Sequence, residues 1–170
     1  RNSGTMVREK TKMEKMLISG VAADKNVAKI RVAGLGNDPE STFRLLNLLD
    51  RNNLNIDVMI QSLGKDGTKS VSFTVAKPDM LRTIDVLNDN KDLLGIKKLD
   101  YDENVAKISV IGAGVRSHSG VAAKMFGALA NAGINTEMIT TSEIRITALI
   151  DEAYADQAMR AIHETFLERV

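Results

Sequence analysis

Two glycine-containing loops hold the residue types in this sequence that are best suited to chemistry. One loop is the segment 34–39, Gly-Leu-Gly-Asn-Asp-Pro, and the other is the segment 112–120, Gly-Ala-Gly-Val-Arg-Ser-His-Ser-Gly. Each lies between a strand-like run and a helical pattern, where free backbone N–H groups and the positive end of the helix dipole favour a carboxylate or a phosphate. A plain tight turn would explain either loop by itself. Because the loop occurs twice, the sequence favours a binding function.

The histidines, serines and carboxylates do not form a catalytic set. His118 lies between Ser117 and Ser119, but no acidic residue follows at the spacing of an orienting partner, and sequence neighbours rarely form a triad. His163 lies in a helical pattern among apolar residues, where a packing or surface role is expected. No pair of carboxylates stands out for acid–base work, and cysteine is absent. We therefore predict no catalytic residues, no metal site and no cofactor in this chain.

Composition and charge exclude several classes of protein. The chain has 170 residues, of which 44% are hydrophobic and 26% charged, as in ordinary soluble domains. A net charge of +1 and an aromatic content of 4% argue against binding to nucleic acid, and Phe73 is the only aromatic residue on the central predicted strands. The apolar runs are too short to span a membrane, and no signal peptide is readable. The sequence thus predicts a cytoplasmic protein without nucleic-acid or membrane partners.

An internal repeat organises the chain. The run 24–30, Asp-Lys-Asn-Val-Ala-Lys-Ile, returns at 102–108 as Asp-Glu-Asn-Val-Ala-Lys-Ile. The glycines of the two loops keep the same offset, and the later run 54–57 matches 134–137. A repeat of this length indicates one structural unit that is present twice.

The first copy alternates between strand and helix periodicity. It predicts strands near 27–32, 56–60, 71–75 and 95–101, a turn at 65–67, and helices that begin at Pro39 and Pro78. The first helical pattern places Phe43 on an apolar stripe, where burial is expected, and the second has Leu81 facing inward. The resulting β-α-β-β-α-β order is that of the ferredoxin-like unit. A dinucleotide-binding fold is built on a parallel sheet, which the predicted β-hairpin contradicts. The third glycine of the Gly-x-Gly-x-x-Gly fingerprint of that fold is also not at its position.

The second copy repeats this order but ends before a fourth strand. It predicts strands at 105–111, 134–141 and 144–150 and helices at 120–132 and 154–168. Because proteins usually avoid an open sheet edge, we expect the apolar segment 16–22 to supply the missing strand. We therefore predict an α+β protein of two ferredoxin-like domains, with a connector at 1–13, the first domain at 25–98, and a discontinuous second domain at 14–24 plus 99–170.

Three segments resemble the tandem ACT domains of aspartate kinase. They are 20–24, 111–121 and 133–146, and the resemblance extends over essentially 4–166. In that family these domains form the regulatory C-terminal half or a separate beta subunit. The resemblance implies an allosteric region that binds end-product amino acids, here lysine with or without threonine, and mediates feedback inhibition. It also implies that ATP, Mg and the phosphorylation of L-aspartate belong to a kinase domain outside this chain.

The resemblance further implies how effectors would be held. ACT domains pair side by side in a homodimer, and effectors lie in the seams, the boundaries between paired units. One seam would use what we call the first-copy group, namely Asn37, Asp38, Pro39, Glu40, Thr42 and Gln61, met by Asn135 and Thr136. The other would use the second-copy group, namely Ser117, His118, Ser119, Gly120, Val121, Ala122, Thr141 and Ser142, met by Asn55, Ile56 and Asp57.

Residue types suggest roles within these seams. Helix-start amides would hold the effector carboxylate, and strand carbonyls with the Asn55 or Asn135 amide would receive its ammonium group. An acid such as Asp57, Asp38 or Glu143 could accept the side-chain amine of lysine.

The first seam departs from the family pattern. Glu40 replaces the usual glycine after Pro39, and Thr42 replaces a common alanine, which favours a cationic effector or blocks the seam. The second seam keeps Gly120 but has Ser119 where proline is usual. A blocked seam would leave the alternative function, a ligand-independent dimerisation module of the same enzyme.

Overall fold

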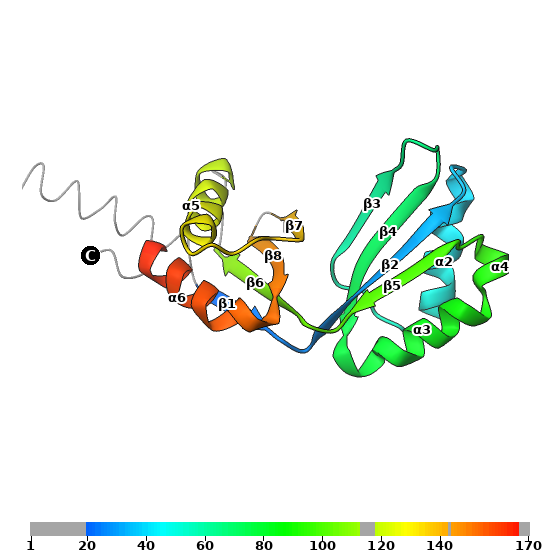
Figure 1. Ribbon diagram of the computed structural model, residues 1–170, viewed down its shortest axis with the longest axis horizontal. Helices are drawn as coiled ribbons and strands as arrows, with labels where there is room; N and C mark the ends of the chain where they lie inside the picture. The colour runs from blue at the N-terminus through cyan, green and yellow to red at the C-terminus, as the bar shows by residue number, and fades with distance from the viewer. Residues whose placement is uncertain (1–19, 113–117, 143, 167–170) are drawn as a thin grey trace, which may run out of the picture. The chain divides into compact units, whose positions relative to one another are not determined.

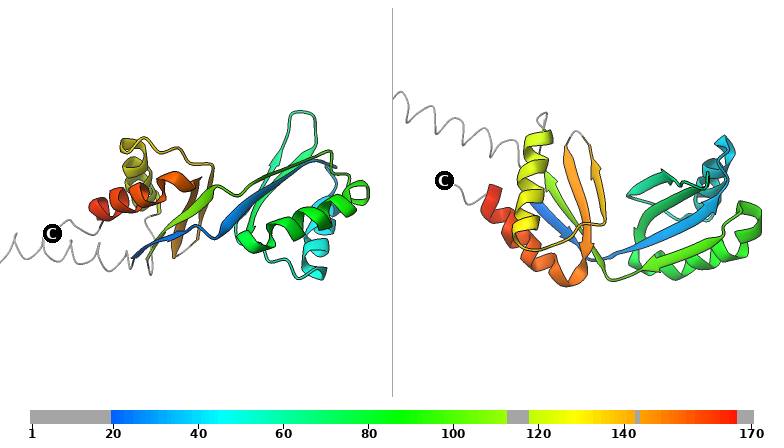
Figure 2. Two further views of the ribbon diagram at one scale, coloured as in Figure 1. Left: turned by 60° about the horizontal axis from the view of Figure 1, so that its bottom comes forward. Right: turned by 45° about the horizontal axis from the view of Figure 1, so that its top comes forward.

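The computed structural model describes residues 20–112, 118–142 and 144–166, without the side chains of His118 and Ser119. The chain divides into two compact units (Figures 1 and 2). We call Asn26–Val105 the first-copy unit, and the described residues of Arg1–Lys25 and Ala106–Val170 the second-copy unit. No helix in these described ranges is long and apolar enough to cross a membrane.

The first-copy unit is a four-stranded sheet with helices packed on one face (Figure 1). The strand order is β3-β4-β2-β5, and all neighbouring strands are antiparallel. In chain order the elements are β2 (Val27–Leu35), α2 (Pro39–Arg51), β3 (Met59–Leu63), β4 (Lys69–Ala76), α3 (Met80–Asp89), α4 (Lys91–Leu94) and β5 (Lys98–Asp102). This is the predicted ferredoxin-like order, with the short helix α4 added.

The core of this unit is formed by apolar side chains that recur at every second position of the central strands. Ile30 on β2 lies opposite Phe73 on β4, and both side chains are completely buried. Leu45 and Leu49 of α2 and Leu87 of α3 join the same buried cluster. Side chains two apart on a strand share one face, so the alternating pattern directs one side of each strand toward the helices.

Two residues that were predicted to be buried are exposed. Phe43 on α2 is 65% exposed and Leu81 on α3 is 68% exposed, so both predictions were wrong. On α2 the buried positions are Ser41, Leu45 and Leu49, which recur every four residues. Phe43 is two positions from that row and therefore lies on the opposite side of the helix.

The start of the second helix also differs from the prediction. Pro78 lies in a short 3₁₀ turn, Lys77–Asp79, and α3 itself begins at Met80. The buried face of α3 consists of Met80, Thr83 and Leu87. The helix α3 thus begins two residues later than the proline suggests, and Leu81 falls outside the buried face.

The second-copy unit has the same architecture with one strand from a distant part of the chain. Its sheet has the order β1-β6-β8-β7, and α5 and α6 pack on it. The elements are β1 (Gly20–Asp24), β6 (Val105–Ile111), α5 (His118–Asn131), β7 (Met138–Thr141), β8 (Arg145–Asp151) and α6 (Ala155–Phe166). A short 3₁₀ turn, Glu152–Tyr154, precedes α6.

Strand β1 confirms that the second sheet is completed from the N-terminal side. It pairs antiparallel with β6, so that Val21 lies opposite Val110 and Ala23 opposite Ile108. Val110 and Ile108 belong to the buried cluster of this unit, against which Val21 also packs. The strand occupies Gly20–Asp24, and the earlier part of the expected segment, 16–19, lies outside the described residues.

The sheet of the first-copy unit extends further than the expected domain limit at residue 98. Strand β5 pairs antiparallel with β2, with Tyr101 opposite Ile30. Residues 99–102 therefore lie in the sheet of the first copy, because they complete its edge. The two units separate between Lys25 and Asn26 and between Val105 and Ala106.

Candidate functional site

The start of α2 is built around the carboxylate of Asp38. Asp38 is the N-cap residue, with extended backbone angles, and Pro39 occupies the first helical position. One carboxylate oxygen, Oδ1, accepts hydrogen bonds from the backbone N–H of Glu40 at 3.1 Å and of Ser41 at 2.7 Å. The hydroxyl of Ser41 donates to the same oxygen at 2.8 Å. An N-cap aspartate followed by proline is a favoured helix start, which explains why the helix begins here.

Two cations lie next to this cap. The guanidinium of Arg44 lies 3.7 Å from Asp38 Oδ2 and 3.1 Å from Glu40 Oε2. The ammonium of Lys69, at the start of β4, donates to the backbone carbonyl of Asp38 at 2.9 Å. The Ser41 hydroxyl, with the two amides and Arg44, holds the pKa of Asp38 below its ordinary value of 3.8, although desolvation opposes this shift. Both acids at the helix start thus share one ion-pair partner, the Arg44 guanidinium.

Two residues of the first-copy group meet across elements. The Thr42 hydroxyl on α2 hydrogen-bonds the Gln61 side-chain carbonyl on the edge strand β3. The helix start and the edge strand that were predicted to share a seam therefore lie side by side. Asn37 is exposed in the loop before α2.

Asn55, Ile56 and Asp57 lie in the segment between α2 and β3. The side chains of Asn55 and Asp57 are exposed, and Ile56 packs against the core of the first-copy unit. The Asp57 backbone N–H donates to the carbonyl of Thr74 on β4 at 3.1 Å, which fixes this segment against the sheet.

The described part of the second-copy group lies at the corresponding place in its own unit. Gly120, Val121 and Ala122 are in the first turns of α5, and Thr141 ends the edge strand β7. The backbone N–H of Ser142 donates to the carbonyl of Arg145 at 2.7 Å, which closes the turn to β8. Ser117 and Glu143 lie outside the described residues, as do the side chains of His118 and Ser119.

Asn135 and Thr136 lie between α5 and β7, in the second-copy unit. Asn135 is exposed and Thr136 is half-buried. The residues predicted to meet the first-copy group therefore belong to the other unit, and Asn55–Asp57 have the same relation to the second-copy group. Neither predicted seam is complete within a single unit.

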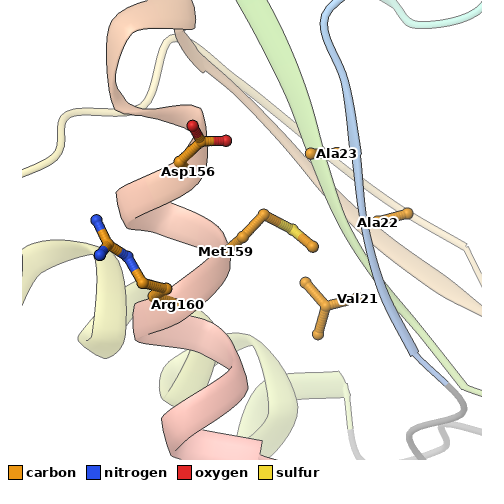
Figure 3. A pocket seen from close by; sticks show the side chains of 6 residues that line it. All are labelled: Val21, Ala22, Ala23, Asp156, Met159 and Arg160. Atoms are coloured by element: carbon orange, nitrogen blue, oxygen red, sulfur yellow. The ribbon is translucent and has the colours of Figure 1, made fainter.

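A separate open hollow of about 750 Å³ lies between β1 and α6 (Figure 3). Figure 3 shows Met159 extending from α6 toward Val21 on β1. At the rim, Asp156 forms an ion pair with Lys25 at 3.6 Å. The lining residues are Val21, Ala22, Ala23, Asp156, Met159 and Arg160, none of which was predicted to bind an effector.

The described residues of the two groups carry hydroxyl, amide and carboxylate side chains. No group of three or more His, Asp or Glu side chains among the residues in the structure could hold a metal ion. The sequence analysis missed Ser41, Arg44 and Lys69, all of which contact Asp38 or Glu40. The order Asp-Pro-Glu-Ser could have identified Ser41 through its N-cap pattern. No local pattern could have identified Lys69, because it is 31 positions from Asp38 in the sequence and contacts it only in the folded chain.

Comparisons with known proteins identify a matching domain family and similar relatives. A model of the ACT domain family matches residues 108–166. The aspartokinase of Pseudomonas aeruginosa PAO1 is 37% identical over 166 residues, which are 96% of this chain and 40% of that relative. The chain thus spans about 40% of the length of this curated relative.

Two solved structures match nearly their whole length. A crystal structure of aspartokinase alpha and beta subunits matches with a TM-score of 0.82 and 42% identity, over 88% of this chain and 98% of that one. The ligand-free regulatory subunit of aspartate kinase from Thermus thermophilus matches with a TM-score of 0.82 and 33% identity, over 88% and 99%.

Proposed function

Since this chain belongs to the aspartokinase family, as a regulatory region of two ACT-type domains, we propose that it senses an end-product amino acid and inhibits the kinase. The proposed effector is lysine, with or without threonine. The kinase activity, ATP-dependent phosphorylation of L-aspartate to 4-phospho-L-aspartate, would reside in a cytoplasmic catalytic domain or alpha subunit. ATP and Mg would bind there, and this region itself would need no cofactor.

The observation that carries this proposal is the contact between Thr42 and Gln61. It joins a helix start to an edge strand, the two elements from which one side of an effector seam would be built. The equivalent elements of the second copy, the start of α5 and the end of β7, carry Gly120 and Thr141. The repeat therefore supports two seams of related design, each completed by a neighbouring unit in a homodimer.

Allosteric inhibition follows if effector binding is coupled to the arrangement of paired units. An effector that contacts two units binds more tightly when those units are held in one relative arrangement, and so increases the population of that arrangement. Inhibition requires that the kinase be less active in the arrangement that the effector favours. The differential affinity of the effector for the two arrangements sets the limit of this inhibition.

Isothermal titration of the purified chain with lysine, threonine and their mixture tests the proposal. Saturable heat with lysine would support an effector-sensing region, and the stoichiometry would give the number of occupied seams. A ligand at 100 times its dissociation constant should also stabilise the fold by about 2.7 kcal/mol in thermal melts. No heat with either amino acid or their mixture would contradict effector sensing and favour the ligand-independent dimerisation module.

A substitution of Asp57 tests the site. Asp57→Ala should weaken lysine binding by about 1–3 kcal/mol if this carboxylate accepts a charged hydrogen bond from lysine. Asp50→Ala, which removes an exposed carboxylate near the end of α2, provides the control and should bind lysine like the wild type. Equal affinity of all three proteins would remove Asp57 from the site.

A further inference from the structure

One oxygen of the Asp38 carboxylate, Oδ1, already accepts three hydrogen bonds from the start of α2. Oδ1 accepts from the Glu40 amide, the Ser41 amide and the Ser41 hydroxyl, at 3.1, 2.7 and 2.8 Å. Oδ2 lies 3.7 Å from the Arg44 guanidinium. Ser41 is only 2% exposed, so this donor is fixed at the core, whereas the Asp38 side chain is 52% exposed. An amino-acid carboxylate at a helix start would use the same kinds of donor, namely backbone N–H groups and a nearby cation.

Two cations near this loop also make contacts within the protein, although the buried Nε of Arg44 has no hydrogen-bond partner. Arg44 is paired with Glu40, and Lys69 donates to the Asp38 carbonyl. A ligand that took any of these donors would have to break a contact that the protein makes with itself. This cost reduces the affinity for an incoming carboxylate, because only the surplus over existing contacts contributes to binding.

The two copies differ in this feature at the level of sequence. The first-copy loop carries Asp38 directly before its helix, followed by Glu40. The second-copy loop, 112–120, contains no aspartate or glutamate. A carboxylate supplied by the loop is therefore a property of the first copy alone.

We infer that the Asp38 carboxylate occupies, in the first copy, the position that an effector carboxylate would take at the start of α2. The first copy then does not bind an amino acid through these amides as long as Asp38 is present. This inference rests on the proposed function, since it assigns Asp38 the role of an internal substitute for part of the effector.

Residue-resolved NMR titration of the full chain tests the inference at the amides of Glu40 and Ser41. The three ligands are L-lysine, L-threonine and acetate, the last as the simplest carboxylate. Asp38→Gly removes the internal carboxylate, and glycine is tolerated at an N-cap position, so that α2 should persist. Asp38→Asn is the matched control, because its side-chain oxygen still accepts hydrogen bonds from the amides. Circular dichroism melts of each variant establish that the fold is retained.

We expect the Glu40 and Ser41 amide signals to stay unchanged in the wild type and in Asp38→Asn, and to shift saturably in Asp38→Gly. Saturable shifts of these amides in the wild type or in Asp38→Asn would overturn the inference, as would unchanged signals in a folded Asp38→Gly chain. If lysine and threonine shift no amide anywhere in the wild type, the proposed function fails. The acetate titration of Asp38→Gly still decides the role of Asp38 in that case.

Discussion

At the scale of single residues, the contribution of Asp38 to the stability of the fold should depend on pH. Hydrogen bonds from Ser41 lower the pKa of Asp38 in the folded chain below its ordinary value of 3.8. The ionised cap therefore stabilises the fold fully above that ordinary value, and this contribution is lost as the pH falls through the lower, folded-state pKa.

The variant Asp38→Asn provides the test of this pH dependence. It keeps an acceptor at the N-cap but removes the charge, so the wild type should be the more stable protein at pH 7. The difference in unfolding free energy should shrink as the pH falls below 3.8, because the wild-type carboxylate becomes protonated. Urea unfolding at pH 7 and at pH 3 measures both differences. An equal difference at the two pH values would show that the charge of Asp38 does not stabilise the helix start.

Gly34, the first residue of the first-copy loop, is required by both its backbone angle and its surroundings. Its φ is +84°, and an added Cβ would lie 2.5 Å from the Cβ of Lys97. The Lys97 backbone is held by its N–H bond to the carbonyl of Ala33 at 2.9 Å, so that it cannot easily move away. The close approach joins the end of β2 to the chain that leads into β5.

Comparison of two glycine variants separates these effects. Gly67 also has a positive φ, +80°, but nothing lies within 4 Å of its added Cβ. Gly67→Ala should therefore cost roughly 1–2 kcal/mol for the left-handed backbone alone. Gly34→Ala should cost about 1–3 kcal/mol more because of overpacking. Chemical denaturation of both variants measures the costs, and equal values would show that Lys97 adjusts without strain.

At the scale of elements, a buried hydroxyl pair links two central strands of the second-copy unit. The hydroxyls of Ser109 on β6 and Thr147 on β8 are 2.9 Å apart, and the two residues are 2% and 5% exposed. When a buried hydroxyl loses its hydrogen-bond partner, the free-energy cost of removing it from water is no longer compensated. The pair should therefore behave as one unit in mutagenesis.

A double-mutant cycle tests this expectation. Ser109→Ala should destabilise the unit by about 1–3 kcal/mol, because Thr147 is left without its partner. Once Thr147→Val has removed the second hydroxyl, the additional Ser109→Ala change should cost less. Unfolding free energies of the two single variants and the double variant give the coupling. Additive costs would mean that the two hydroxyls do not depend on each other.

The order of the elements could be predicted because the spacing of apolar residues changes at each boundary. Apolar residues alternate with polar ones along strands and recur every three to four residues in helices. The edge strand β1 followed from a physical requirement, since β6 would otherwise be left at an open edge of the sheet. The exposed positions of Phe43 and Leu81 could not be read from their apolar character, because the buried face of a helix is set by all the residues that it packs against. The contact of Lys69 with Asp38 depends on the tertiary fold and has no local signature.

At the scale of the whole molecule, the chain contains one continuous and one discontinuous unit. The first-copy unit holds all four strands of its sheet and its own buried cluster within Asn26–Val105. The second-copy unit needs β1, which is separated from β6 along the chain by the whole first-copy unit. We propose on this ground that the two units differ in their ability to fold alone.

Fragments of the chain test this asymmetry. The fragment 26–105 should give a dispersed NMR spectrum and a cooperative unfolding transition, because no element of its sheet is missing. The fragment 106–170 should not, since β6 then lacks its outer neighbour and Val21 no longer packs on the core. A peptide of residues 18–25 should restore dispersion by adding β1, whereas the same peptide with Val21→Asp should not, because that side chain faces the apolar cluster. If the fragment 106–170 folds equally well without any peptide, β1 only covers an edge and is not needed to form the unit.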